Sequence, residues 1–207
     1  HDHLPGSALR GLFVGLYLRA NEGRVTPETL LSQTDAEKSA EIEALFFDGN
    51  VRYLNGYPLL NGTRSLPVPL SWHEDKNAGD GDNGTFVDFS FGAPDQHEGE
   101  SWKSVKHPYW TASKGYAEVF RPLRNIAIHT QRDRIAGRSR RGSGAVFRND
   151  ALAAGQTFRA AIVGKDEVVD RLAALLQVGV EGLALGRSRN GGYGRVTLTV
   201  RDAPQNP

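Results

Sequence analysis

The sequence contains no cysteine and no methionine among its 207 residues. Without cysteine the chain cannot hold a disulfide framework, a thiolate zinc site or a cysteine nucleophile, which fits a reducing compartment such as the cytoplasm. No apolar run approaches the roughly 18 residues that a membrane helix needs, and no signal peptide opens the chain, so we expect no membrane association. Because a complete translation product begins with methionine, we expect the true start to lie upstream of His1.

The formal net charge of +1 hides a strong asymmetry between the two halves of the chain. Residues 1–100 hold 7 Lys and Arg against 16 Asp and Glu, a net charge of −9, whereas residues 101–207 hold 18 against 8, a net charge of +10. The chain is also 39% hydrophobic, enough for a packed core. We expect the basic half to face a polyanion, and the acidic half to face protein neighbours or solvent.

Periodicity predicts helices over residues 7–20, 35–46 and 166–176. In the first helix, apolar residues recur at the spacing of one face, and Ser7 is the expected N-cap. Shorter alternating or apolar runs predict strands, while residues 106–121 show no clear pattern. The expected strands are Val51–Leu54, Leu66–Trp72, Thr85–Phe91, Asn125–His129, Ala145–Phe147, Gln156–Val163 and Arg195–Val200.

The later half therefore runs strand, basic hairpin, strand, helix, glycine-rich loop, strand. That order fits an α+β, ferredoxin-like domain. We accordingly expect a first domain over residues 1–120 and a second over residues 121–207. The alternative, one domain split by an insertion, stays open.

The glycine-rich loop, Gly186–Arg195, is the strongest local motif. Its glycines allow close approach of the backbone to a ligand, and successive amide groups in such loops form concavities that bind anions. The loop follows a helix and precedes a strand, so it is neither of the known nucleotide-binding fingerprints. Its sequence predicts either RNA or phosphate binding, or a flexible hairpin with solvated arginines. Its candidate RNA-binding residues are Arg187, Arg189, Asn190, Gly191, Gly192, Tyr193 and Gly194.

The arginine loop, residues 131–144, is the second basic feature. Between Arg121 and Arg148 the chain holds eight arginines and one acid, Asp133. So many like charges repel one another unless a polyanion neutralises them, and binding to such a partner weakens as salt rises. We expect Arg138, Arg140 and Arg141 to contact phosphates, and both loops to flank a groove for single-stranded nucleic acid in one domain.

The opening segment Leu4–Gly11 is a loop that runs into a helix. Free amide groups at a helix N-terminus attract phosphate, and Ser7 and Arg10 are candidates for side-chain contacts. His129, His1 and His3 are candidate general bases, but the sequence favours a strand-end role for His129, and His1 and His3 flank Asp2 at the very start of the sequence. No cofactor motif and no metal-ligating pattern occurs, and Asp80 and Asp82 do not complete a calcium loop.

Taken in order, LPGSALRG, the arginine loop, AAGQTFRAAIVG and GRSRNGGYGRV resemble the RAMP superfamily of CRISPR-associated proteins. The stretches GNVRYLNGYPLL and RSLPVPLSW are similar to the Csx-ten group of subtype III-D, placed among the Cas-five-like proteins. The resemblance implies ferredoxin-like (RRM-like) RAMP domains with a glycine-rich loop before the last strand. It also implies a further strand before LPGSALRG, which this sequence does not contain.

As to function, the resemblance implies a non-catalytic subunit of a type III effector complex that grips CRISPR RNA. Its partners would be other Cas subunits, with target RNA as a further candidate. Two alternatives stay open: a metal-independent endoribonuclease of the same superfamily that processes guide precursor RNA, and a single-strand binding module unrelated to CRISPR.

Overall fold

The computed structural model describes residues 2–21, 36–77, 86–92, 101–113, 115–130, 146–176, 182–186 and 191–201. The chain divides into two compact units. The helical unit combines His3–Gly56 with Ala160–Pro207, and the sheet unit contains Asp2 and Tyr57–Arg159. This division differs from the expected boundary between residues 120 and 121, which falls inside the sheet unit. It is the arrangement of one unit interrupted by the insertion of another.

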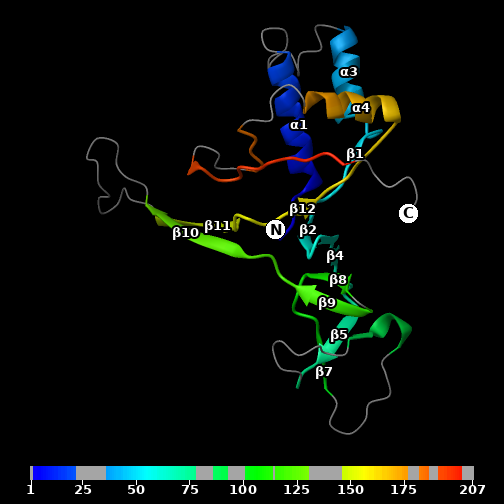
Figure 1. Ribbon diagram of the computed structural model, residues 1–207, viewed down its shortest axis with the longest axis vertical. Helices are drawn as coiled ribbons and strands as arrows, with labels where there is room; N and C mark the ends of the chain where they lie inside the picture. Colours follow the sequence, from blue (N-terminus) through cyan, green and yellow to red (C-terminus); the bar gives the residue numbers. More distant parts are fainter. Residues whose placement is uncertain are drawn as a thin grey trace. The chain divides into compact units, whose positions relative to one another are not determined.

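The described residues of the helical unit form three helices and one pair of short strands. The helices are α1 (Gly6–Ala20), α3 (Ala36–Phe46) and α4 (Asp166–Leu175), and in Figure 1 α4 crosses α1 beside α3. β1 (Arg52–Tyr53) pairs antiparallel with β13 (Ile162–Val163). All three predicted helices are confirmed, with bounds that differ from the expected ones by one residue at most.

The core of the helical unit forms on the predicted apolar face of α1. Leu9, Leu12, Phe13 and Leu16 are all buried there. Leu172 of α4 and Leu183, which lies after α4, join the same cluster. The burial of these side chains is the main favourable term that holds the two segments of the helical unit together.

The start of α1 depends on glycine rather than on the predicted serine cap. The N-cap residue is Pro5, whose side chain makes no capping hydrogen bond, and Ser7 is exposed in the first turn. The amide of Gly6 instead donates a hydrogen bond of 2.9 Å to Oδ1 of Asn55. A Cβ atom at position 6 would lie 1.9 Å from the carbonyl oxygen of Tyr53, so only glycine fits this approach. The prediction that Ser7 caps the helix is therefore wrong.

In the sheet unit, the described strands form four small antiparallel sheets. β2 (Tyr57–Leu60) pairs with β3 (Thr63–Arg64) and β12 (Phe158–Arg159), and β8 (Tyr109–Ser113) pairs with β4 (Leu66–Pro67) and β9 (Tyr116–Phe120). β5 (Trp72–Asp75) pairs with β6 (Phe86–Asp88) and β7 (Trp102–Ser104). β10 (Arg124–Thr130) and β11 (Val146–Leu152) form a two-stranded ribbon.

Several predicted strands change character in the structure. The predicted strand over residues 66–72 separates into β4 and the start of β5, because Pro69 opens a turn closed by the Trp72 amide. The strand predicted over residues 85–91 ends at Asp88 and continues as a 3-10 helix, η1 (Phe89–Phe91). The run of residues 156–163 divides between the units, since β12 pairs in the sheet unit and β13 in the helical unit. Residues 106–121, left unassigned from sequence, contain the β8–β9 hairpin.

The mixture of helices and antiparallel sheets confirms the α+β class. In the described parts of the chain, no helix has the length and apolar character needed to cross a membrane.

Replacement of Leu172 by alanine tests the core. Leu172 is 1% exposed, so we expect Leu172→Ala to lower the free energy of unfolding by about 2–5 kcal/mol. Urea unfolding of the helical unit is measured by far-UV circular dichroism, which reports the loss of the helices. Tryptophan fluorescence reports only on the sheet unit, because Trp72, Trp102 and Trp110 all lie there. Leu70→Ala, at a side chain 98% exposed, is the control and should change the value by less than about 0.5 kcal/mol. Equal losses for both variants would contradict this description of the core.

Candidate nucleic-acid interface

The described part of the glycine-rich loop belongs to a tight hairpin. The Leu185 amide donates to the Gly194 carbonyl oxygen over 2.8 Å, and the Val196 amide donates to the Leu183 carbonyl oxygen over 3.0 Å. Ala184 and Arg195 form the bridge between the two arms. Beyond Arg195 the predicted strand is not assigned, although Val196 and Leu198 pack on the core. Arg187, Arg189 and Asn190 lie outside the described residues.

Gly194 is required by this hairpin for two independent reasons. Its φ of +75° lies in the left-handed region that favours glycine. In addition, a Cβ atom at position 194 would lie 2.0 Å from the Leu185 carbonyl oxygen. The glycine at position 194 therefore lets the two arms approach, and this approach places Tyr193 and Arg195 beside α1.

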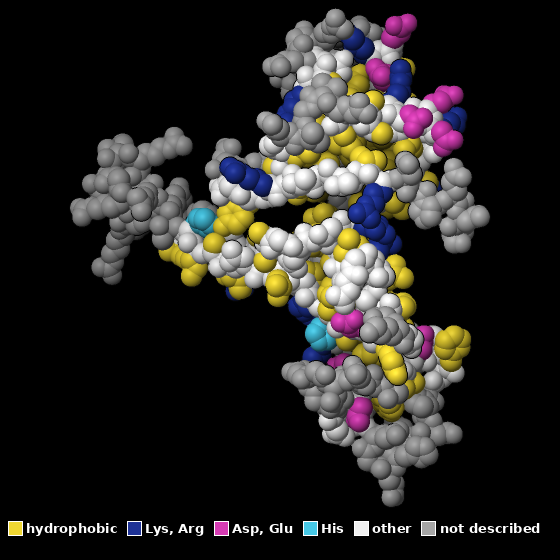
Figure 2. Space-filling model, viewed as in Figure 1, with side chains coloured by type: hydrophobic (Ala, Val, Ile, Leu, Met, Phe, Trp, Pro, Cys, Tyr) yellow, Lys and Arg dark blue, Asp and Glu magenta, His cyan; other side chains and the backbone are white. Residues whose placement is uncertain are grey.

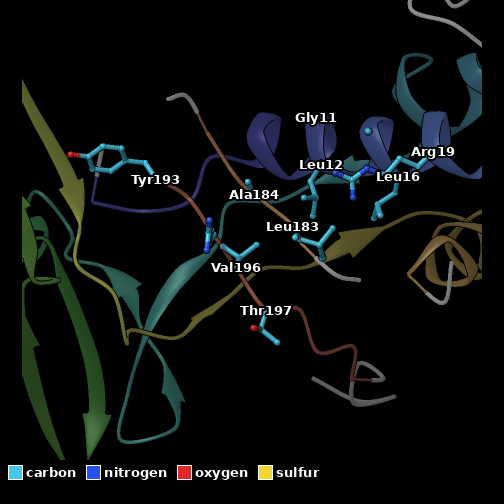
Figure 3. A pocket seen from close by; sticks show the side chains of 12 residues that line it. Gly11, Leu12, Leu16, Arg19, Leu183, Ala184, Tyr193, Val196 and Thr197 are labelled. Atoms are coloured by element: carbon cyan, nitrogen blue, oxygen red, sulfur yellow. The ribbon is translucent and has the colours of Figure 1, made fainter. Parts of the chain in front are cut away.

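A cavity of about 710 Å³ lies between α1 and this hairpin, entirely within the helical unit (Figure 3). Leu12 and Leu16 of α1 and Leu183 of the hairpin supply buried apolar lining. Gly11 and Gly15 line it one helical turn apart, and neither carries a side chain that would narrow it. The cavity therefore offers accessible helix backbone beside an apolar surface.

Two cations and an aromatic ring complete the cavity lining: Arg19, Arg195 and Tyr193. Figure 3 shows Arg19 and Tyr193 at opposite ends of this lining. Within the described parts of the chain, no carboxylate lies at ion-pair distance from Arg19 or Arg195. Both guanidinium groups are therefore available to an anionic ligand in that part of the structure.

The predicted contacts from the start of α1 do not line this cavity. Arg10 instead donates to the Phe46 carbonyl oxygen over 3.4 Å, and its guanidinium lies 5.7 Å from the centre of the Phe47 ring. The carbonyl oxygens at the C-terminal end of α3 carry partial negative charge, which offsets the cost of a cation in the first turn of α1. Helix α1 contributes Gly11, Gly15 and Arg19 to the cavity, and none of the three is among the predicted RNA-binding residues.

The arginine loop lies outside the described residues, and with it Arg138, Arg140 and Arg141. It connects β10 and β11, whose paired ends are Thr130 and Val146. At the opposite end of this ribbon, Arg124 donates to Oδ1 of Asp150 over 2.6 Å and also forms an ion pair with Asp2. These hydrogen bonds raise the pKa of Arg124, and the Arg124 guanidinium lowers the pKa of Asp150. Asp2 thus has a structural role at the base of the ribbon.

The two basic loops, expected in one domain, belong to different units. The glycine-rich loop is part of the helical unit and the arginine loop is part of the sheet unit. The difference arises because the chain leaves the helical unit after Gly56 and re-enters it at Ala160. Each loop is therefore a separate candidate surface.

The histidines provide no assembled catalytic site in the described structure. His129 lies on β10 opposite Phe147, and His3 lies just before α1. Across the described ranges, no group of three or more His, Asp or Glu side chains is placed to hold a metal ion. No protein-family model matches the chain, and no curated protein matches it in sequence.

Alanine substitutions at two glycines test the hairpin. Gly192 also has a positive φ, +81°, but a Cβ atom there would meet nothing within 4 Å. We expect Gly192→Ala to cost about 1 kcal/mol from backbone strain alone. Gly194→Ala should cost more, because its Cβ also displaces the Leu185 carbonyl and breaks the hairpin hydrogen bonds. Hydrogen exchange at the Leu185 and Val196 amides measures the loss of these hydrogen bonds. Retained protection of both amides in Gly194→Ala would contradict the close approach of the two arms at Gly194.

Proposed function

We propose that the chain is an RNA-binding subunit of a type III CRISPR effector complex and that it binds the backbone of the guide RNA. The observation that carries this proposal is the cavity between α1 and the glycine-rich hairpin. It combines two arginines without described ion-pair partners, an aromatic ring and glycine backbone at one place.

The chemistry of this cavity suits a single strand of RNA. Arginines make charge-assisted, often bidentate, hydrogen bonds to phosphate oxygens. An aromatic ring such as that of Tyr193 stacks on an unpaired base, and base stacking of this kind tolerates any sequence. Gly11 and Gly15 leave α1 without side chains along one stripe, so a sugar–phosphate chain can approach the helix closely.

The element order of the helical unit supports a ferredoxin-like reading of its fold. Apart from α3, the order α1, β1, β13 and α4 corresponds to α-β-β-α, and the segment from Arg195 onward, which holds a bridge residue but no assigned strand, takes the place of the last β. This is the ferredoxin-like pattern β-α-β-β-α-β after its first strand. In this proposal the sheet unit is an insertion between the two middle strands, and the glycine-rich loop precedes the last strand, as in the RAMP superfamily.

The arginine loop provides the second RNA contact in this proposal. It carries five of the eight arginines between Arg121 and Arg148, at the end of the β10–β11 ribbon. Other Cas subunits are the proposed protein partners, and target RNA paired to the guide is a further proposed ligand. The proposed role is binding without cleavage, in the cytoplasm.

Replacement of the two cavity arginines tests the proposal. We expect the Arg19→Ala, Arg195→Ala double variant to bind single-stranded repeat RNA about 30-fold more weakly, at about 1 kcal/mol per lost contact. Each lost phosphate contact should also reduce the slope of log K against log salt by about 0.7. Fluorescence anisotropy at several salt concentrations measures both values. Arg171→Ala, an exposed arginine of α4 outside the cavity lining, is the matched control.

An unchanged affinity with an unchanged salt slope would refute the cavity as an RNA site. In the same assay, Arg187→Ala with Arg189→Ala tests the glycine-rich loop, and Arg138→Ala, Arg140→Ala with Arg141→Ala tests the arginine loop. Labelled repeat RNA recovered intact supports a binding subunit. Defined cleavage products that disappear in His129→Ala would instead support the endoribonuclease alternative.

A further inference from the structure

The sheet unit displays two large apolar side chains almost entirely to solvent. Leu70 is 98% exposed and Phe91 is 91% exposed. Single exposed apolar residues are common at protein surfaces, but two that lie on connected turns form a candidate contact surface. Figure 2 shows hydrophobic side chains at the surface in the region of η1, with acidic side chains of the sheet unit nearby.

Both side chains lie on short turns that hydrogen bonds hold in place. The Trp72 amide donates to the Pro69 carbonyl oxygen over 3.1 Å and closes the turn that carries Leu70. The Gly92 amide donates to the Phe89 carbonyl oxygen over 3.2 Å and closes the turn that carries Phe91. We call residues 69–72 and 89–92 the paired turns.

A backbone hydrogen bond joins the two paired turns. The Phe89 amide donates to the Ser71 carbonyl oxygen over 2.9 Å. The Ser90 amide donates to Oδ1 of Asp88 over 2.9 Å, which caps η1. Backbone hydrogen bonds therefore hold the turns that carry Leu70 and Phe91, so a partner that covers these side chains need not order the backbone of the turns first.

The aromatic residues beneath the paired turns are packed among themselves. The Phe89 ring stacks on His73 with centroids 4.0 Å apart and planes 12° apart, and it also meets Trp102 at 6.4 Å. Trp72 stacks on Phe86 at 6.0 Å. These rings therefore pack against one another beneath the paired turns. The exposed side chains of Leu70 and Phe91 are not part of this packing.

The charge of the same stretch indicates what kind of partner fits. Residues 66–104 contain 2 Lys and 8 Asp and Glu. One of the two lysines, Lys103, lies 3.7 Å from Glu74. Hydrogen bonds from Ser71 and Ser90 lower the pKa of Asp88 to about 2, so this carboxylate is charged at neutral pH. The sequence of this stretch therefore carries an excess of negative charge, which disfavours nucleic acid and favours a cationic protein as the partner of the turns within it.

We propose that the paired turns are a docking surface for a protein partner that presents an apolar pocket rimmed by lysine and arginine. Leu70 and Phe91 would enter the pocket, and the surrounding carboxylates would meet the basic rim. The inference is independent of the proposed RNA cavity, because it concerns the sheet unit and a partner of opposite charge.

Site-specific photo-crosslinking in cells that naturally produce the protein tests this surface. The full chain carries p-benzoylphenylalanine in place of Leu70 or Phe91. Tyr116, 74% exposed on β9 of the same unit, is replaced in the same way as the control. We expect irradiation to give one discrete protein adduct from positions 70 and 91, at least about ten-fold above the control. Mass spectrometry should place the crosslink on apolar residues flanked by lysine or arginine.

Three results would overturn the proposal: an adduct that ribonuclease removes, an adduct between two copies of this chain, or no yield above that of the Tyr116 control. The Leu70→Ser, Phe91→Ser double variant gives a second readout and should fold normally, since both side chains are exposed. It should retain the crosslink-identified partner about ten-fold less well during affinity purification, while its RNA affinity stays unchanged. Full retention of that partner would also refute the docking surface, whatever the outcome for the RNA cavity.

Discussion

The packing of α1 against segments from the far end of the chain is the contact on which the helical unit depends. Leu12 and Leu16 of α1 share one core with Leu172 of α4 and with Leu183 in the hairpin. The residues of this core become buried only when the two segments of the helical unit meet. In the sequence, the whole sheet unit separates these segments. The cavity beside α1 is a direct result, because the same contact that buries Leu183 also brings Tyr193 and Arg195 to the helix.

The arrangement of charge gives the two units different roles in this account. Among the described residues, no carboxylate pairs with Arg19 or Arg195, so their guanidinium groups are available for the anionic ligand proposed above. In the sheet unit, Arg124 is held between Asp2 and Asp150, and it stabilises the base of the ribbon instead of binding phosphate. The paired turns are apolar and belong to a stretch, residues 66–104, with 2 Lys and 8 Asp and Glu, which favours a protein over a nucleic acid as their partner. Position and partners, rather than the number of arginines, decide what each basic residue can do.

Sequence periodicity was sufficient for the helices, because the apolar face of α1 and the pattern of α4 report burial directly. The alternation of apolar and polar residues did not predict the division of residues 156–163. This single run forms β12 in the sheet unit and β13 in the helical unit. The pairing partners of such a run lie about a hundred residues away, and local propensity carries no information about them. Ser7 and Arg10 were predicted to bind RNA because a helix N-terminus attracts anions, whereas in the structure the Gly6 amide donates to Asn55 and Arg10 donates to the end of α3. Gly11, Gly15 and Arg19 recur every four residues and therefore lie on one face of α1. This spacing is the sequence signal for the part of α1 that lines the cavity.

Crosslinking of RNA that contains 4-thiouridine tests the central claim most directly. After irradiation and digestion with trypsin, the account predicts RNA attached to the short peptide of residues 190–195, which contains Tyr193, and to residues 11–19 of α1. Both peptides line the same cavity. Attachment confined to other peptides, with these two recovered unmodified from a saturated complex, would contradict the assignment of this cavity as the RNA site.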